Sequence, residues 1–506
     1  MSTVILDCYT DEPSGLGVPP YLGTYPRYLA GKLELEGEPW DYITIDDLRA
    51  FRKGRLGPQF PRPSQKTDIF IYNQTNQDIA AILSRCSRLI VNLGVHAPGK
   101  YLSAMPGTLH EIIPLIQDLH CEKILTGPAV FGTSLQGGRM FEKADLSLFS
   151  KIEPFKFRFD EIRSISLAGA VLLKKIPDLR IVEIETGRGC SRAIGCSFCT
   201  EPIKSRFEAR DPKDVVDEVK ALYELGQRYF RLGKQACFFS IPKGIEILEG
   251  IHKECPKIEV LHIDNVDPIM VNTPRGLRTA EAVVKYCTPG NIAAFGVESF
   301  DPVVIEQNHL NSTPERTYEA IKTINRIGAK RGANGVPSFL PGINILFGLM
   351  GETKATHDHN MHWLKKIIAD GLLLRRINIR QVAVFEGTDL HERAGTRFLK
   401  KNRSHYFRWR NDIRQHIDLP NLERAFPIGS ILHNVRTEIY DGNTTFARQV
   451  GTYPLVIGIK GRMPLGRFIS VEVSGHMLRS IVGRLVSGPP AMEQSIVMQS
   501  PVSAVS

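Results

Sequence analysis

Short apolar runs alternate with stretches of helical spacing over residues 1–150. The apolar runs are residues 4–6, 68–72, 88–92 and 123–126, and the helical stretches are 77–85 and 108–119. Strands that alternate with helices of this size predict a doubly wound parallel sheet, so the fold class is α/β. A segment rich in Gly and Pro, residues 11–26, follows the first run, where such folds place a binding loop.

A second and longer series of the same kind occupies residues 178–392. Its predicted strands are 181–185, 228–232, 259–264, 292–297, 342–347 and 377–384, and its predicted helices are 211–225, 244–254, 276–287, 313–327 and 356–370. Six strand–helix repeats predict a partial (β/α)6 barrel. The functional groups of such a barrel lie at the C-terminal ends of its strands.

The pattern changes after residue 392. Residues 393–429 form a basic and aromatic segment, interpreted as a linker, which contains Arg408, Trp409 and Arg410. Residues 430–487 hold short β-like runs separated by Gly and Pro, which predict a small OB-like β-barrel. Residues 488–506 are rich in Ser, Pro and Met without any period, and we expect a disordered tail there.

Composition narrows the class of protein. The 506 residues are 42% apolar and 23% charged, as in a globular protein of two or three domains. The sequence has no apolar run of about eighteen residues and no signal-like N-terminus. We therefore expect a cytoplasmic protein that does not bind a membrane. A net charge of +10 permits a polyanionic partner.

Nine cysteines are present, and their odd number and scattered positions favour reduced thiols over disulfides. Three of them, Cys190, Cys196 and Cys199, share a glycine-rich loop directly after the first predicted barrel strand. Three thiolates can hold a 4Fe–4S cluster and leave one iron open for the amino and carboxylate groups of S-adenosylmethionine. A zinc site would need a fourth ligand, and buried structural thiols would not need this spacing.

Phe198, before the last cysteine, and the strand–Gly–Cys context resemble the radical S-adenosylmethionine superfamily, although the spacing is C-x5-C-x2-C rather than C-x3-C-x2-C. Residues 296–299 (GVES) and 344–353 (NILFGLMGET) resemble motifs of the branch with the methylthiotransferases and coproporphyrinogen dehydrogenase. The resemblance implies one 4Fe–4S cluster on the three cysteines and an S-adenosylmethionine site. The residues that it assigns to this site are Phe198, Glu298, Ser299, Ile345, Gly348 and Glu352. Taken alone, Glu352 could serve only a helix dipole.

The second barrel strand lacks the Gly-Gly-Glu that holds the methionine amino group in many members of the superfamily. Gly233 and Gln235 stand in its place. Cys237 lies on the same rim, where a buried packing thiol is the favoured interpretation. On the third strand, His262 or Asp264 could bind substrate or move a proton, or could simply fill the barrel.

The resemblance also implies a reaction. A reduced cluster passes one electron to the sulfonium, and the resulting 5′-deoxyadenosyl radical abstracts hydrogen from the substrate. The electron would come from a donor such as ferredoxin or flavodoxin.

Residues 464–473 (PLGRFISVEV) and their neighbours resemble a TRAM domain, an RNA-binding barrel. Arg408, Trp409 and Arg410 would suit base stacking and phosphate pairing, or would belong to a solvated amphipathic helix. This domain order is similar to that of the tRNA methylthiotransferases, whose N-terminal domain holds a second cluster. Here Cys8 is kept, but residues 93–94 and Pro128 stand where further ligands would be, so one cluster is expected. The cobalamin motif Asp-x-His-x-x-Gly is also absent.

The whole chain is similar to a mainly archaeal group of iron–sulfur oxidoreductases that carries the signature GRGC…GCSFCTEP, here residues 187–202. The leading interpretation is radical modification of RNA, with tRNA as the partner. An alternative is a radical enzyme for a small molecule or peptide that uses the C-terminal barrel as a scaffold. A further alternative is a non-catalytic iron–sulfur protein that binds RNA.

Overall fold

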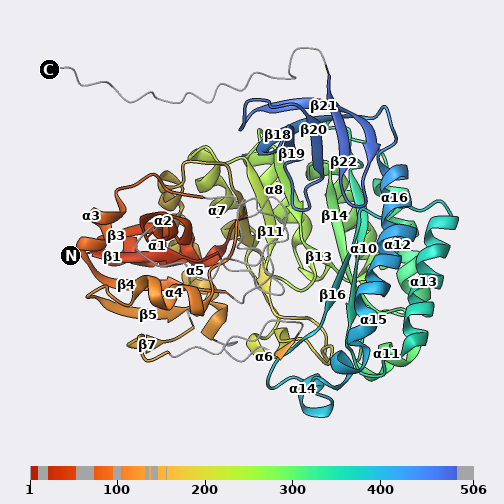
Figure 1. Cartoon of the computed structure of the whole chain (residues 1–506), viewed down its shortest axis with the longest axis horizontal. Helices are drawn as coiled ribbons and strands as arrows, with labels where there is room; N and C mark the ends of the chain where they lie inside the picture. Colours follow the sequence, from red (N-terminus) through yellow and green to blue (C-terminus); the bar gives the residue numbers. More distant parts are fainter. Residues whose placement is uncertain are drawn as a thin grey trace.

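The computed structural model describes residues 2–9, 21–52, 73–94, 104–130, 136–137, 146–154 and 157–486. The predicted strand 68–72 and the predicted tail 488–506 lie outside these residues. Figure 1 shows an N-terminal α/β part, a central barrel wrapped by helices, and a small β-barrel above it. No helix of the described residues is long and apolar enough to cross a membrane.

The N-terminal sheet is parallel throughout and doubly wound, as predicted. Its strands are β1 (Ser2–Asp7), β3 (Trp40–Thr44), β4 (Cys86–Asn92), β5 (Glu122–Thr126) and β7 (Lys151–Ile152), in the order β3-β1-β4-β5-β7. Its helices include α2 (Ile45–Arg52), α3 (Ile79–Ser84) and α4 (Leu109–Ile116). The strand order reverses beside β1, because the chain passes from β1 to β3 on one side and then crosses to β4 on the other, and such sheets have their crevice at this point.

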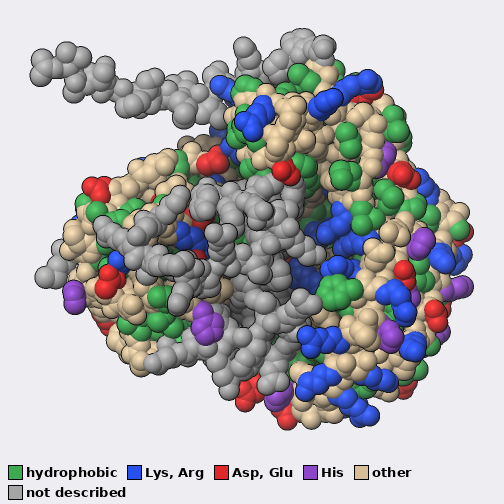
Figure 2. Space-filling model, in the orientation of Figure 1, with side chains coloured by type: hydrophobic (Ala, Val, Ile, Leu, Met, Phe, Trp, Pro, Cys, Tyr) green, Lys and Arg blue, Asp and Glu red, His purple; other side chains and the backbone are tan. Residues whose placement is uncertain are grey.

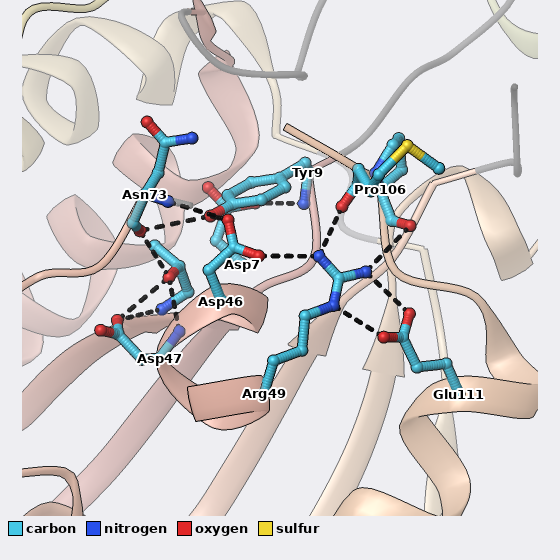
Figure 3. Close-up of polar contacts among 10 residues, drawn as sticks. Asp7, Tyr9, Asp46, Asp47, Arg49, Asn73, Pro106 and Glu111 are labelled. Carbon is cyan, nitrogen blue, oxygen red and sulfur yellow. Dashed lines mark hydrogen bonds and ion pairs between the residues drawn. The ribbon is translucent and has the colours of Figure 1, made fainter. Parts of the chain in front are cut away.

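A buried polar network fastens the C-terminal edge of this sheet (Figure 3). Arg49 donates from Nε to Oε1 of Glu111 at 2.7 Å and from Nη1 to Oδ1 of Asp46 at 2.8 Å. The other carboxylate oxygen of Asp46 accepts from the Tyr9 hydroxyl at 2.8 Å and from the Asn73 backbone N–H at 2.9 Å. These bonds satisfy the buried charges, so the network makes this edge rigid.

The Gly/Pro-rich segment does not end as a binding loop. Its described residues 21–26 form β2 (Tyr21–Leu22), which pairs in parallel with barrel strand β8 (Ile181–Glu185), and begin α1 (Thr24–Glu36). Helix α1 packs on α5 (Phe159–Gly169) so closely that a Cβ on Gly31 would lie 1.9 Å from the Ile165 carbonyl oxygen. The first helix of the chain is therefore built into the wall of the central barrel.

The central barrel contains the six predicted strands. They are β8, β11 (Tyr229–Gly233), β12 (Val260–Ile263), β14 (Asn291–Glu298), β15 (Phe339–Phe347) and β16 (Arg376–Gln381). They lie in two parallel sheets, β12-β11-β8-β2 and β13-β14-β15-β16, where β13 is Asn265–Val266. The outer helices are α7 (Pro212–Glu224), α8 (Gly244–Glu254), α10 (Pro274–Tyr286), α12 (Pro314–Gly328) and α13 (Lys354–Ala369).

Alternation along these strands separates an apolar outer face from a charged inner face. Val182 and Ile184 of β8 are fully buried in the main hydrophobic core. Between them, Glu183 accepts from Nη1 of Arg231 at 3.2 Å, and Arg231 also pairs with Asp264. Paired charges line the interior of this barrel, so the interior is suited to binding polar ligands and is not a core of apolar side chains.

The segment predicted as a basic linker is instead a helical arm. It consists of α15 (Arg397–Ile413), a π-helical turn (Arg414–Asp418) and α16 (Leu419–Ala425). The chain then forms a closed barrel in the order β18-β19-β20-β22-β21. These strands are β18 (Ile431–Asp441), β19 (Thr444–Gln449), β20 (Val456–Lys460), β21 (Phe468–His476) and β22 (Ile481–Leu485). The small β-barrel is thus confirmed, and its likeness to a TRAM domain stays a prediction.

The loop between β19 and β20 caps the amino ends of the central strands. The Tyr21 hydroxyl donates to the Gly451 carbonyl at 3.3 Å, and Arg375 donates to the Tyr453 carbonyl at 2.8 Å. The Thr452 backbone N–H donates to Nδ1 of His262 at 3.2 Å. His262, offered by the sequence as a catalytic or filling residue, therefore joins the two barrels.

Burial of His262 makes this junction sensitive to acid. Burial lowers the pKa of His262 from 6.5 to about 4. Between these values the unfolded chain takes up a proton that the folded chain does not, so stability is complete above pH 6.5 and falls as the pH drops toward 4. The loss should be on the order of 3 kcal/mol. Denaturant unfolding against pH should show this slope in the wild type and in exposed H416Q, and H262Q should flatten it. An unchanged slope in H262Q would contradict the assignment.

Candidate active site

The three clustered cysteines lie on the loop that leaves the C-terminal end of β8. All three are half-buried, and none of the nine cysteines forms a disulfide. Gly189, directly before Cys190, has φ +72°, and a Cβ there would lie 2.5 Å from the Arg206 carbonyl oxygen. Only glycine fits both requirements. The loop therefore begins with a turn that sets the path of Cys190.

Two buried contacts fix the second half of this loop. Ser197 is 2% exposed, and its hydroxyl donates to Oδ1 of Asn308 at 2.7 Å. Its backbone N–H donates to the Asn308 carbonyl at 2.9 Å. Phe198 and Cys196 pack on an apolar cluster that includes Leu349 and Val382. Phe198 thus anchors the loop through packing.

The thiol of Cys196 lies beside both a cation and a carboxyl group. Arg192 donates from Nη1 to Sγ of Cys196 at 3.0 Å. Burial raises the pKa of Cys196 to about 12, Arg192 opposes the shift, and charge on Cys199 and Glu298 adds to it. The cysteine loop and the end of β14 are therefore within electrostatic reach of each other. Among the described residues, no three His, Cys, Asp or Glu side chains gather closely enough to hold a metal ion.

Glu298 ends β14 in a strained conformation. Its φ is +62°, and the Ser299 backbone N–H donates to the Val297 carbonyl at 2.7 Å, which defines a γ-turn. Withdrawal from water raises the pKa of Glu298 to about 8, and the Arg380 guanidinium opposes the shift. Such strain is typical of functional sites. Ser299 is 1% exposed, and its hydroxyl accepts from the Asp301 N–H at 3.1 Å, so it stabilises the turn.

The end of β15 is held by a carboxylate from the following turn. Gly348 has φ +99° and donates its N–H to Oε2 of Glu352 at 2.7 Å. Oε1 of Glu352 accepts from Asn402 of α15 at 2.8 Å. Glu352 therefore positions Gly348. The Ile345 side chain is 1% exposed and lies in the outer hydrophobic core, so it does not line the barrel interior as the sequence suggested.

Gly233 ends β11 at the same rim, and Gln235 follows it. A Cβ on Gly233 would lie 2.7 Å from Oε1 of Glu183, so glycine lets this carboxylate approach the backbone. Gln235 is 2% exposed and accepts from the Thr186 hydroxyl at 2.9 Å, which ties β11 to the end of β8. Cys237 is 7% exposed and accepts from the Asp267 N–H at 3.2 Å, as a packing thiol would.

Comparison with known proteins agrees with this geometry. Residues 184–359 match the Radical SAM superfamily, a range that includes the cysteine loop and the ends of β14 and β15. An uncharacterized protein of Methanocaldococcus jannaschii is 40% identical and aligns with 96% of this chain and 93% of its own length. The chain belongs to the radical S-adenosylmethionine superfamily.

Two further likenesses concern parts of this radical S-adenosylmethionine enzyme. A protein of Methanocaldococcus jannaschii that bears the name of a methylthiotransferase is 28% identical over 29% of this chain and 33% of its own length. Among solved structures, the radical S-adenosylmethionine methyltransferase TsrM from Kitasatospora setae has a TM-score of 0.47 and 15% identity, with 77% of each chain covered.

The radical S-adenosylmethionine superfamily uses a 4Fe–4S cluster and S-adenosylmethionine. The residues of this radical S-adenosylmethionine barrel fit both groups by their chemistry. Cys190, Cys196 and Cys199 supply thiols, the ligands that iron–sulfur clusters require. Gly233, Gln235 and the strained Glu298 lie at neighbouring strand ends, where polar groups of a bound S-adenosylmethionine would find partners.

Of the three residues predicted to bind RNA, Trp409 is buried, whereas Arg408 and Arg410 reach the surface at least in part. Trp409 is 2% exposed, and its ring stacks between His357 at 5.5 Å and His405 at 5.3 Å. It is therefore part of the core beneath α15 and does not offer a face to a base, which corrects the prediction. Arg408 is exposed, and Arg410 is half-buried with its guanidinium 5.0 Å from the Phe407 ring.

In the N-terminal sheet, the three loops that hold a second cluster in methylthiotransferases do meet. Cys8 donates its N–H to the Asn92 carbonyl at 3.0 Å, and Ala129 donates to the Leu93 carbonyl at 3.0 Å. Leu93 and Pro128 stand where two of the ligands would be, and Cys8 is fully buried. Two of the three positions therefore lack a thiol, and a single cluster in the radical S-adenosylmethionine enzyme stays a prediction.

Asn308 is a residue of the site that sequence reasoning missed. It is fully buried, and its amide accepts from Ser197 and donates to the Val304 and Met350 carbonyls, both at 2.8 Å. It therefore joins the cysteine loop to the loop after β15. No local signal marks it, because Met350 and Ser197 are 42 and 111 positions away.

Replacing Asn308 with alanine should loosen the cysteine loop. The change leaves several buried polar groups unsatisfied, each worth about 1–3 kcal/mol, so we expect a loss of roughly 3 kcal/mol and less iron per chain. Iron analysis after anaerobic reconstitution and denaturant unfolding measure the two effects. Exposed Asn411→Ala is the matched control. If N308A bound iron as fully as N411A, the proposed anchoring would be wrong.

Proposed function

We propose that this radical S-adenosylmethionine enzyme modifies RNA, with tRNA as the substrate class. The observation that carries the proposal is the exposed face of α15. Its cations Arg397, Lys400, Lys401, Arg403 and Arg408 are exposed. The acid of this helix, Asp412, is engaged with Nε2 of His357 at 3.1 Å. Figure 2 shows many Lys and Arg side chains over this part of the molecule.

Among the residues that the structure describes, none of these five cations forms an ion pair with a carboxylate. A line of such cations beside an active-site barrel suits a polyanion more than a neutral metabolite. The closed five-stranded barrel that follows α15 adds support, because small barrels of this size are common RNA-binding modules. Partial similarity to a protein named as a methylthiotransferase points in the same direction.

When bound, the cluster and S-adenosylmethionine supply a 5′-deoxyadenosyl radical for hydrogen abstraction. The chain itself has three tasks. The thiols of Cys190, Cys196 and Cys199 hold iron. The turn at Glu298 and the backbone at Gly348 orient the bound S-adenosylmethionine, and the capped barrel excludes water. A ferredoxin or flavodoxin would supply the electron.

The test uses the full-length, anaerobically reconstituted protein. Total tRNA from a strain lacking this gene is incubated with the enzyme, S-adenosylmethionine and dithionite, and its nucleosides are compared by mass spectrometry. We expect a nucleoside missing from the deletion strain to appear with wild type and not with C190A. Formation of 5′-deoxyadenosine without any change in tRNA nucleosides would overturn the proposal and favour a small molecule or peptide as substrate. A truncation that removes residues 398–506 cannot replace this test, because Trp409 packs in the central core and the β19–β20 loop caps the barrel.

A further inference from the structure

Arginines from three separate parts of the chain meet at the open edge of the central barrel. Arg376 and Arg380 share the inner face of β16, and Arg410 and Arg414 lie one turn apart where α15 passes into the π-helical turn of the helical arm. Arg479 comes from the turn between β21 and β22. Nη1 of Arg414 donates to the Ile377 carbonyl at 2.7 Å, which fixes the arm against β16. We call these five residues the arginine cluster.

The five guanidinium groups are close enough to repel one another. Burial and the charges of Arg414, Arg376 and Arg410 together lower the pKa of Arg479 to about 10, against the opposing effect of Asp418. The pKa of Arg376 is lowered by burial and by its neighbours Arg380 and Arg414. Guanidinium groups stay charged at neutral pH in proteins, so the cluster concentrates positive charge.

Little negative charge balances the arginine cluster. Asp418 pairs with Arg414 across the π-helical turn. In the part of the chain that the structure describes, the other four arginines form no ion pair with a carboxylate. Two of them are instead oriented by a neutral acceptor, since Oδ1 of Asn378 accepts from Arg376 at 3.3 Å and from Arg380 at 3.4 Å. Uncompensated charge is unfavourable unless an anion joins it.

The position of the cluster connects the exposed basic helix with the reaction chamber. Arg380 is exposed and acts on the carboxyl of Glu298, at the rim where S-adenosylmethionine is expected. Arg410 continues the row of cations on α15. Figure 2 shows Lys and Arg side chains gathered in the hollow below the C-terminal barrel, over β16. A strand that follows α15 would pass this hollow before one of its bases reached the barrel.

We propose that the arginine cluster binds backbone phosphates of the RNA next to the nucleotide that enters the barrel. This inference rests on the RNA function proposed above and names its anchoring site. Guanidinium groups suit the role because their planar forks bind phosphate oxygens in pairs, and because they stay charged. The arginines come from the barrel edge, the helical arm and the C-terminal barrel. The phosphate site would therefore form only when all three parts are folded together.

The test measures binding of a fluorescein-labelled tRNA transcript to the full-length protein by anisotropy over a range of salt concentrations. The variant R410Q/R479Q removes two cations that lie outside the S-adenosylmethionine site. We expect its affinity at 0.1 M salt to fall on the order of tenfold, and its slope of log K against log salt to decrease by about 1.4, for two phosphates lost. R410K/R479K should recover part of the affinity. R278Q/R316Q, on exposed positions of α10 and α12, should bind like wild type.

Three outcomes would overturn the proposal in different ways. Equal affinity and salt slope for wild type and R410Q/R479Q would remove the anchoring site and leave RNA modification standing. Failure of wild type to bind the transcript would remove the proposed function as well. If AMP raised the unfolding temperature of wild type but not of R410Q/R479Q, while the transcript did not bind, the cluster would serve a small phosphorylated substrate instead.

Discussion

Replacing Cys190 with alanine should abolish iron–sulfur binding and reductive cleavage of S-adenosylmethionine. The loop supplies three thiols, and a cluster that keeps one iron open has no ligand to spare. The turn at Gly189 also sets the position of Cys190, so no neighbouring side chain can take its place. We expect at least a thousandfold loss of 5′-deoxyadenosine formation, on the scale seen when an essential group is removed. Iron content, visible absorbance and product chromatography measure the effect.

Cys237→Ala is the matched control, because this thiol lies on the same barrel rim but packs in the core. It should keep both cluster and activity, with a small loss of stability. If C190A kept its iron and cleaved S-adenosylmethionine, assignment of the triad would be wrong. If C237A lost both, Cys237 would have to be counted among the functional groups.

Replacing Glu218 with alanine should destabilise the fold by about 3–5 kcal/mol. Glu218 of α7 is fully buried and pairs with Nη1 of Arg27 at 2.5 Å and with Nη1 of Arg210 at 2.6 Å. Both arginines also donate to carbonyls of β8, Arg27 to Glu183 and Arg210 to Glu185. Without the carboxylate, two buried guanidinium groups would lie unpaired beside the strand that leads into the cysteine loop. A shift in the denaturant midpoint measures the loss.

The same helix supplies a control. Lys213 and Asp217 form an exposed i,i+4 pair at 2.6 Å. Lys213→Ala should cost less than about 1 kcal/mol, because water screens such pairs. Glu218→Gln keeps one acceptor and should fall between the two. Equal denaturant midpoints for E218A and K213A would contradict the prediction, because the buried triad would then stabilise the fold no more than the exposed pair does.

The central barrel could be predicted from the sequence because each strand–helix unit carries its own local pattern. The six strands lie within a few residues of their predicted positions, since apolar residues on the outer face alternate with polar ones on the inner face. Strand β2 could not be predicted in this way. It has only two residues, and its partner β8 lies about 160 positions further along the chain. The helical arm was predicted only as an alternative to a linker, because the basic residues around Trp409 hid the apolar face of α15.

The cysteine triad was equally accessible, because its three members lie within ten residues of one another. Roles that depend on distant partners were not. Glu352 was assigned to S-adenosylmethionine from its motif, but its partner Asn402 lies on α15 and makes it a support for Gly348. Ile345 was assigned from the same motif, although the pleat turns its side chain outward. A motif identifies a strand end, and only the register decides which side chain faces the ligand.

The hydrogen bond between Tyr21 and Gly451 also constrains how the chain is made. These residues are 430 positions apart. At about 5–20 residues per second, a ribosome would take roughly 20–90 s to add the second after the first. At the start of that time neither β8 nor the capping loop has been made. The apolar side chains of Tyr28, Leu29 and Leu33 then have no core to enter. The apolar side chains of α1 must therefore wait for α5 and for β8, which lies about 160 positions further along the chain, and the bond that ties Tyr21 to the cap can form only after residue 451 has been added.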